Sequence, residues 1–96
     1  MPPNKPLEWT NRAAQEYLHA LAFIATESGA RNATLIMQRI ERAEAILAIQ
    51  PNIGTPGRRA GTREYPVKRT GHTLIYRLTS SRIQILRFLH QRMEYR

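Results

Sequence analysis

The most informative part of the chain for its fold is Gly61–Met93, GTREYPVKRTGHTLIYRLTSSRIQILRFLHQRM. Its alternation of apolar and polar residues predicts three short strands, over residues 63–68, 73–78 and 82–89, joined by tight turns. Pro66 has no N–H to donate to a neighbouring strand, so the first of the three should have an open side there. The last is apolar on both faces, which is typical of a strand in the interior of a sheet.

Upstream of this stretch, the pattern predicts a short edge strand over residues 7–10 and two helices over residues 11–28 and 30–49. Thr10 or Asn11 is a suitable cap for the first helix. Gly29 and Pro51 end the first and second helices. The short link between the helices makes them an antiparallel hairpin. The expected apolar stripes are Ala14, Tyr17, Leu18, Leu21, Ile24 and Ala25 on the first helix and Ala33, Ile36, Met37, Ile40 and Leu47 on the second.

These elements predict one α+β domain over residues 1–96, with the order β-α-α-β-β-β. The helical hairpin should pack on one face of a small antiparallel sheet to which the first strand is added. The second face is expected to be partly open to a partner, unless loops and the C-terminal tail cover it. The loop 51–62 is a Pro- and Gly-rich connector. Together with the start of the next strand it offers a candidate anion-contacting site at Arg58, Arg59 and Arg63.

The charge balance is strongly basic. Fifteen Lys and Arg stand against seven Glu, which gives a formal net charge of +8, and thirteen of the fifteen are Arg. A small domain with this balance seeks anionic partners such as nucleic acid, an acidic protein or a membrane surface. The alternative interpretation is charge that serves solubility alone.

Composition and motifs also argue against several kinds of chemistry and of protein. The chain has no Cys, so disulfides and thiolate chemistry are absent. His19, His72 and His90 lack the spacing of metal ligands, and no motif predicts a metal or another cofactor. No signal-peptide pattern is present, and no apolar run approaches the ~20 residues of a membrane span. We therefore expect a cytoplasmic protein with no membrane partner.

A set of motifs follows the expected helical hairpin in a fixed order. It consists of Pro-x-x-Gly at 51–54, Gly-Thr-Arg-Glu at 61–64, His-x-Leu-Ile-Tyr-Arg-Leu at 72–78 and Ile-x-Ile-Leu-Arg-Phe-Leu-His-Gln-Arg-Met at 83–93. This set resembles the RelE/ParE superfamily of toxins from toxin–antitoxin systems. The resemblance covers nearly the whole chain and implies the superfamily's fold. Within it, the Tyr-Arg and Leu-His pairs are similar to those of ParE-like plasmid stabilisation proteins.

The resemblance implies one of two activities. RelE-like members are ribosome-dependent endoribonucleases that cut mRNA, whereas ParE-like members poison DNA gyrase and have no known nuclease activity. Both cause growth arrest, and an acidic antitoxin, ParD-like for ParE, wraps and neutralises the toxin. The partners implied for this chain are therefore an acidic antitoxin in a hetero-oligomer and DNA gyrase, with DNA or the ribosome reached through the target.

The residues at the RelE-type catalytic positions separate these activities. Cutting RNA through its 2′-hydroxyl needs a base, an acid and cations for the phosphorane. The resemblance places RelE-type Lys at the positions of Glu64 and Pro66 and an Arg at the position of Thr73, and only Arg92 matches a catalytic Arg. We therefore expect a non-catalytic, ParE-like gyrase inhibitor with no catalytic residues. The endoribonuclease is the main alternative, and a basic nucleic-acid-binding module without a toxin role is a third.

Target-binding residues are expected at the end of the last strand and in the tail beyond it. These candidates are Arg87, His90, Arg92, Tyr95 and Arg96. Arg87 interrupts an apolar strand, and a buried Arg needs a carboxylate partner, for which Glu64 across the sheet is the expected choice. A second, looser nuclease interpretation uses His90 with Tyr95, although their spacing does not match the His-Tyr pair of such enzymes.

Overall fold

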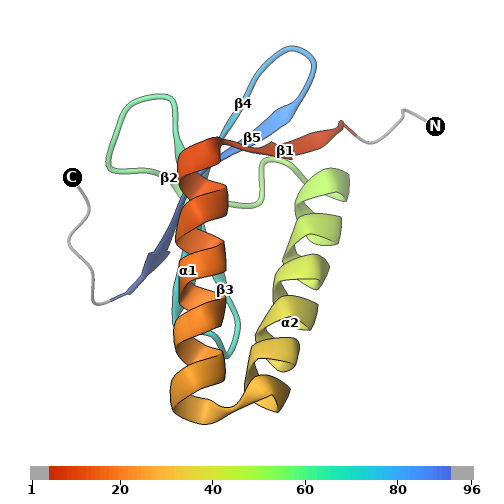
Figure 1. Cartoon of the computed structure of the whole chain (residues 1–96). Coiled ribbons are helices and arrows are strands. Elements are labelled where there is room, and N and C mark those ends of the chain that lie inside the picture. Colours follow the sequence, from red (N-terminus) through yellow and green to blue (C-terminus); the bar gives the residue numbers. More distant parts are fainter. Residues whose placement is uncertain (1–4, 92–96) are drawn as a thin grey trace.

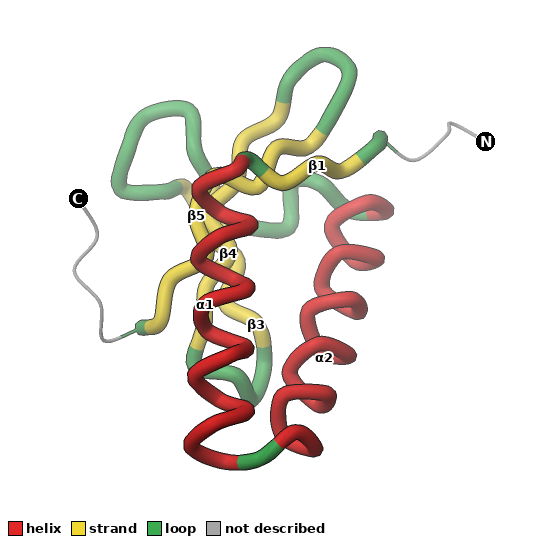
Figure 2. Tube along the Cα trace, in the orientation of Figure 1, coloured by secondary structure: helices red, strands yellow, loops and turns green. Residues whose placement is uncertain are grey.

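The structure is a computed structural model that describes residues 5–91 of the chain. Two helices pack on one face of a five-stranded sheet (Figure 1). The elements are β1 (Leu7–Trp9), α1 (Asn11–Ser28), α2 (Ala30–Ile49), β2 (Thr55–Pro56), β3 (Arg63–Val67), β4 (His72–Leu78) and β5 (Ile83–His90). The α+β class and both helix ranges predicted from the sequence are confirmed. The β3–β4 turn lies at the same end of the molecule as the α1–α2 link (Figure 2).

The predicted residues begin and end the helices. The Thr10 hydroxyl accepts a hydrogen bond from the Ala13 N–H at 3.2 Å, which caps the start of α1. Gly29 ends α1 with φ = 96°, a conformation that side chains disfavour. The chain then turns directly into α2. Neither helix in the described part of the chain is long and apolar enough to span a membrane.

The predicted apolar stripes were partly wrong. On α2 the buried residues are Ile36, Ile40, Ala43 and Leu47, which follow the spacing of one helix face. Met37 lies beside this face and is 42% exposed, and on α1 Leu18 is 64% exposed. Ala25 is also exposed. Apolar character alone did not distinguish the face that meets the sheet from its borders.

The sheet has the strand order β1-β5-β4-β3-β2, so β5 lies in its interior as predicted. Two features differ from the expectation. The edge strand β1 pairs with β5 in parallel, and the predicted connector loop contains β2, which pairs with Arg63 and Glu64 of β3. A strand of two residues has no sequence periodicity, so only its tertiary pairing defines it.

A bulge in β5 explains why this strand is apolar on both faces. Ile75 of β4 pairs with Arg87, but the next residue, Tyr76, pairs with Ile85, which leaves Leu86 as the extra residue. Ile85 and Phe88 therefore both face the helices, although they are three positions apart. The buried core under the helices consists of Ala13, Ile36, Ile40, Ala43, Leu47, Val67, Leu74, Tyr76, Ile83, Ile85 and Phe88.

The face of the sheet opposite the helices is not open at its centre. Ile75 and Leu89 lie on it and are only 1% and 4% exposed. Towards the β1 edge the same face carries a polar row, in which Gln84 binds Glu8 at 2.6 Å and Arg77 binds Gln84 at 2.7 Å. The expectation of a partly open second face is therefore wrong for this central region.

Candidate functional site

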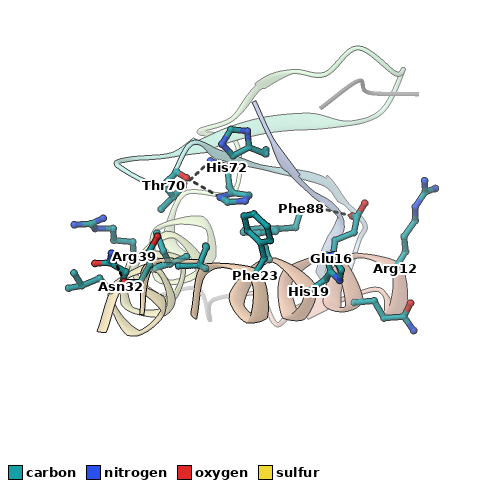
Figure 3. Close-up of a pocket in the computed structure, with 16 residues that line it drawn as sticks. Arg12, Glu16, His19, Phe23, Asn32, Arg39, Thr70, His72 and Phe88 are labelled. Carbon is teal, nitrogen blue, oxygen red and sulfur yellow. Dashed lines mark hydrogen bonds between the residues drawn. The ribbon is translucent and has the colours of Figure 1, made fainter. Parts of the chain in front are cut away.

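A cavity of about 1040 Å³, the helix–sheet pocket, lies between the helical hairpin and the end of the sheet that carries the β3–β4 turn. One wall consists of α1 residues from Arg12 to Ser28 and α2 residues from Asn32 to Arg39. The opposite wall consists of Thr70, His72, Phe88 and His90. Figure 3 shows the ring of Phe23 pointing from α1 towards His72 on the sheet side.

The helix–sheet pocket is rich in apolar surface that water can reach. Phe23 projects from α1 with 63% of its surface exposed, and Leu35 of α2 is 38% exposed. On the sheet side the rings of His72 and Phe88 are stacked, with centroids 4.5 Å apart and an interplanar angle of 11°. His19 is exposed and lines the pocket. Exposed apolar side chains around a concave surface are typical of a docking site.

His72 is a pocket residue that sequence reasoning did not identify. Its Nδ1 lies 3.0 Å from the carbonyl oxygen of Thr70, which can only accept, so Nδ1 carries the proton. Burial lowers the pKa of His72, with a smaller contribution from the nearby His90, so the ring is neutral near pH 7. The alternation of Leu74 and Tyr76 extends back to His72 and was the signal that could have placed it on the core side.

Arg87 and Glu16 form an ion pair beside the helix–sheet pocket. Nε and Nη2 of Arg87 lie 3.0 and 2.8 Å from Oε2 of Glu16. The other oxygen, Oε1, accepts the N–H of Phe88 at 2.9 Å. Both side chains are largely buried, with 13% and 20% of their surface exposed. Glu16 therefore pairs with Arg87. It also accepts a backbone N–H on the part of the β5 edge that lies beyond the end of β1.

The predicted Glu64 partner of Arg87 is wrong. Both residues pair with Ile75, so they lie in one row but on opposite sides of β4. Two strand spacings, roughly 10 Å, separate them. Glu64 instead contacts Arg58, whose N–H and Nε lie 3.1 and 3.7 Å from its carboxylate.

The other predicted target-binding residues fall in two groups. His90 is the last residue of β5, pairs with His72 and contacts its ring edge-on at a centroid distance of 5.1 Å. The expectation that it leaves the sheet is wrong, because the strand continues one residue further than predicted. Arg92, Tyr95 and Arg96 lie outside the described residues.

The candidate anion-contacting loop is partly engaged in internal contacts. Nη1 of Arg63 donates to the carbonyls of Asn52 and Gly54 at 3.2 and 2.8 Å. Arg58 contacts Glu64, and Arg59 is exposed. Arg63 thus stabilises the loop that precedes β3, and anion contact by the three Arg stays a prediction.

The three positions that correspond to RelE-type cations do lie together. Pro66 of β3 pairs directly with Thr73 of β4, and Glu64 lies two residues before Pro66 on the same face. This patch therefore presents a carboxylate, a proline ring and a hydroxyl group. Residues 5–91 contain no group of three or more His, Cys, Asp or Glu that could hold a metal ion.

Comparison with known proteins agrees with this fold. A family model described as the ParE toxin of the type II toxin–antitoxin system parDE matches residues 7–95. One similar solved structure is the chromosomal ParDE TA system from P. aeruginosa, with 24% identity, a TM-score of 0.81 and coverage of 90% of this chain and 95% of that chain. Another is the toxin–antitoxin complex RelBE2 from Mycobacterium tuberculosis, with 23% identity, a TM-score of 0.61 and coverage of 91% and 98%. No curated protein matches.

The two structural similarities confirm the RelE/ParE-like fold expected from the motifs. The family match supplies the assignment, because it spans all the described strands and both helices. This chain belongs to the ParE toxin family of type II toxin–antitoxin systems.

Proposed function

We propose that this chain is a toxin that inhibits DNA gyrase by binding without catalysis, and that an acidic ParD-like antitoxin neutralises it. The helix–sheet pocket supports the antitoxin assignment, because Phe23 and Leu35 expose apolar surface there on a domain of net charge +8. An amphipathic segment can bury its apolar side against these residues. The structures with a similar fold are themselves described as toxin–antitoxin systems.

Charge complementarity favours an acidic segment. Arg12 of α1 and Arg39 of α2 line the helix–sheet pocket from different helices. Inside the pocket the Glu16 carboxylate is occupied by Arg87 and by the Phe88 N–H. Acidic side chains of the antitoxin can therefore pair with cations at the border while apolar side chains contact Phe23.

The polar groups on the outer sheet face support a non-catalytic toxin. The patch of Glu64, Pro66 and Thr73 contains no cation at the three positions where the RelE resemblance requires one. A carboxylate there would repel the phosphate that a ribonuclease must stabilise. RNA cleavage at this patch is therefore disfavoured electrostatically, which supports gyrase inhibition over the endoribonuclease alternative.

The antitoxin assignment is tested by calorimetry with the acidic ParD-like protein that we propose as the antitoxin. Phe23→Ala should weaken binding about 30-fold or more, as expected for a central aromatic contact worth about 2 kcal/mol. Leu18→Ala is the matched control, because Leu18 is equally exposed on the same helix but does not line the pocket. Equal affinity of the Phe23 variant and the wild type would place the antitoxin elsewhere.

The gyrase assignment is tested with two parallel assays on the purified toxin. DNA supercoiling by gyrase should fail in its presence, and cleaved DNA–gyrase complexes should accumulate. Primer extension on mRNA from translating ribosomes should show no new cuts. Codon-specific cuts with normal supercoiling would assign the chain to the endoribonuclease class instead.

The C-terminal tail is the proposed target surface, together with Arg87 and His90. Arg92→Ala combined with Tyr95→Ala should abolish growth arrest while leaving the melting temperature and antitoxin affinity close to those of the wild type. Growth after induction, measured beside thermal melts, provides the readout. Full toxicity of the double variant would move the target surface to the helical hairpin or to Arg58 and Arg59.

A further inference from the structure

A second concavity of about 600 Å³, the basic groove, lies between α2 and β3. Four cations line it: Arg39 and Arg42 from α2, and Lys68 and Arg69 from the β3–β4 turn. The ring of Tyr65 and apolar side chains of α2 and β3 line the same groove. No Glu is among the lining residues, so the groove has a single sign of charge.

Within residues 5–91, none of these four cations forms a salt bridge. The three described ion pairs use other basic residues, namely Arg58, Arg82 and Arg87. Cations gathered in a concave surface without carboxylates raise the local positive potential, because the low-dielectric walls focus the field. The basic groove therefore has the electrostatics of an anion site, which the paired cations elsewhere do not have.

The basic groove is held in shape by hydrogen bonds from side chains to backbone carbonyls. Nη1 of Arg39 donates to the carbonyl of Arg69 at 2.9 Å, which ties α2 to the β3–β4 turn. In the same turn the Thr70 hydroxyl donates to the carbonyl of Val67 at 2.8 Å. Arg69 has φ = 62°, a left-handed conformation that costs about 1–2 kcal/mol for a residue with a side chain. The fold thus maintains a disfavoured backbone that presents Lys68 and Arg69 beside α2.

We propose that the basic groove binds the phosphodiester backbone of a single nucleic-acid strand. Arg39 and Arg42 are one helical turn apart, so their side chains emerge about 5–6 Å from each other and can contact successive anionic groups. Arg guanidinium groups match phosphate oxygens in forked geometry. Tyr65 adds an aromatic surface in the same groove, and rings beside cations are characteristic of sites that bind single strands. This site goes beyond the proposed antitoxin and gyrase interactions and does not depend on them.

The test is fluorescence anisotropy with a labelled single-stranded DNA of about 20 nucleotides at about 50 mM salt. Arg42→Gln with Lys68→Gln removes two charges from the groove and leaves the Arg39–Arg69 contact in place. Arg31→Gln with Arg77→Gln removes two charges from exposed positions elsewhere and is the matched control. Neither Arg42 nor Lys68 lines the helix–sheet pocket, so failure here is distinguishable from failure of the antitoxin assignment.

The groove variant should bind about tenfold more weakly than the wild type, and the control should stay within about twofold. The slope of log affinity against log salt should fall by about 1.4 in the groove variant, since each phosphate contact with a single strand contributes about 0.7. Equal losses in the two double variants would show attraction by net charge alone and overturn the proposal. Displacement of the DNA by polyglutamate as effectively as by unlabelled DNA would reassign the groove to an acidic protein segment. Thermal melts of both variants confirm that they are folded.

Discussion

The helix–sheet pocket and the basic groove share Leu35 and Arg39 of α2, yet their chemistry is opposite. In the pocket wall, the Glu16 carboxylate is paired with Arg87 beside the pocket and His72 is kept neutral by burial, so apolar surface dominates. In the basic groove, cations line the surface without a carboxylate among the lining residues. One helix therefore borders a site suited to burial of apolar side chains and a site suited to anions.

The difference comes from where the few Glu residues lie and which Arg residues they pair with. Glu8, Glu16 and Glu64 each pair with an Arg outside the basic groove. Glu44 on α2 accepts the indole N–H of Trp9 at 2.9 Å. With seven Glu for fifteen basic residues, their placement rather than the net charge decides which surface is electropositive. Four predictions test this difference between the two surfaces.

The largest effect is expected for Glu16→Ala. The change leaves the guanidinium of Arg87 and the N–H of Phe88 without their common partner in a largely buried place. We expect a loss of about 2–4 kcal/mol in the free energy of unfolding, measured by urea denaturation. Arg82→Ala is the control, since it breaks a much more exposed pair with Glu8 and should leave the unfolding midpoint nearly unchanged. Similar losses in both variants would show that the Glu16–Arg87 pair is not special.

The second prediction measures how a pocket variant and a groove variant each bind both proposed ligands. Phe23→Ala should lose about 2 kcal/mol of antitoxin affinity but bind single-stranded DNA within about twofold of the wild type. Arg42→Gln with Lys68→Gln should show the reverse pattern. Calorimetry and anisotropy on the same preparations provide both readouts. If either variant lowered the affinity for both ligands equally, the pocket and the groove would be parts of one binding surface.

The third prediction concerns Gly71, which joins the turn bearing the groove cations to β4 in the pocket wall. Gly71 has φ = 71°, and an added Cβ would lie 3.0 Å from Nε2 of His90. Gly71→Ala should cost about 1–2 kcal/mol of stability. Gly61→Ala provides the comparison, because Gly61 has φ = 80° with nothing within 4 Å of an added Cβ. Thermal melts should rank Gly71→Ala below Gly61→Ala, and the opposite order would contradict the close approach of His90.

The smallest effect is a pH dependence from His72. Its pKa in the folded chain lies below the ordinary value of 6.5, so the unfolded chain binds more protons in this range. The contribution of the neutral His72 ring to the free energy of unfolding is therefore complete above about pH 6.5, and it declines as the pH falls towards the lowered pKa. His72→Gln should flatten the fall in unfolding free energy between about pH 7 and pH 5. The lowered pKa of Glu8 acts below 4.5, outside this window. An unchanged pH profile in the variant would contradict the assignment to His72.

Sequence patterns anticipated the site only where its residues follow a local rule. The end of α1 at Gly29 and the interior place of β5 were predictable from local conformational preference and from apolarity. The alternation over residues 73–78 predicted the strand β4 but was not extended to His72, which begins that strand. The exposed position of Phe23 could not be predicted. An apolar residue on a helix is expected to be buried unless the elements that pack on that helix are known.

Local patterns and composition were enough to predict the two helices, the three main strands and the strong positive charge. Each of these depends on residues close in the chain, through capping at Thr10 and through periodicity, or on composition. Tertiary structure alone decided that Arg87 pairs with Glu16, 71 residues away, and not with Glu64. It also decided which cations remain without a carboxylate, because pairing depends on distances that folding creates. Two side chains pair only when folding brings them within bonding distance, and residues close together in the sequence do not determine that distance.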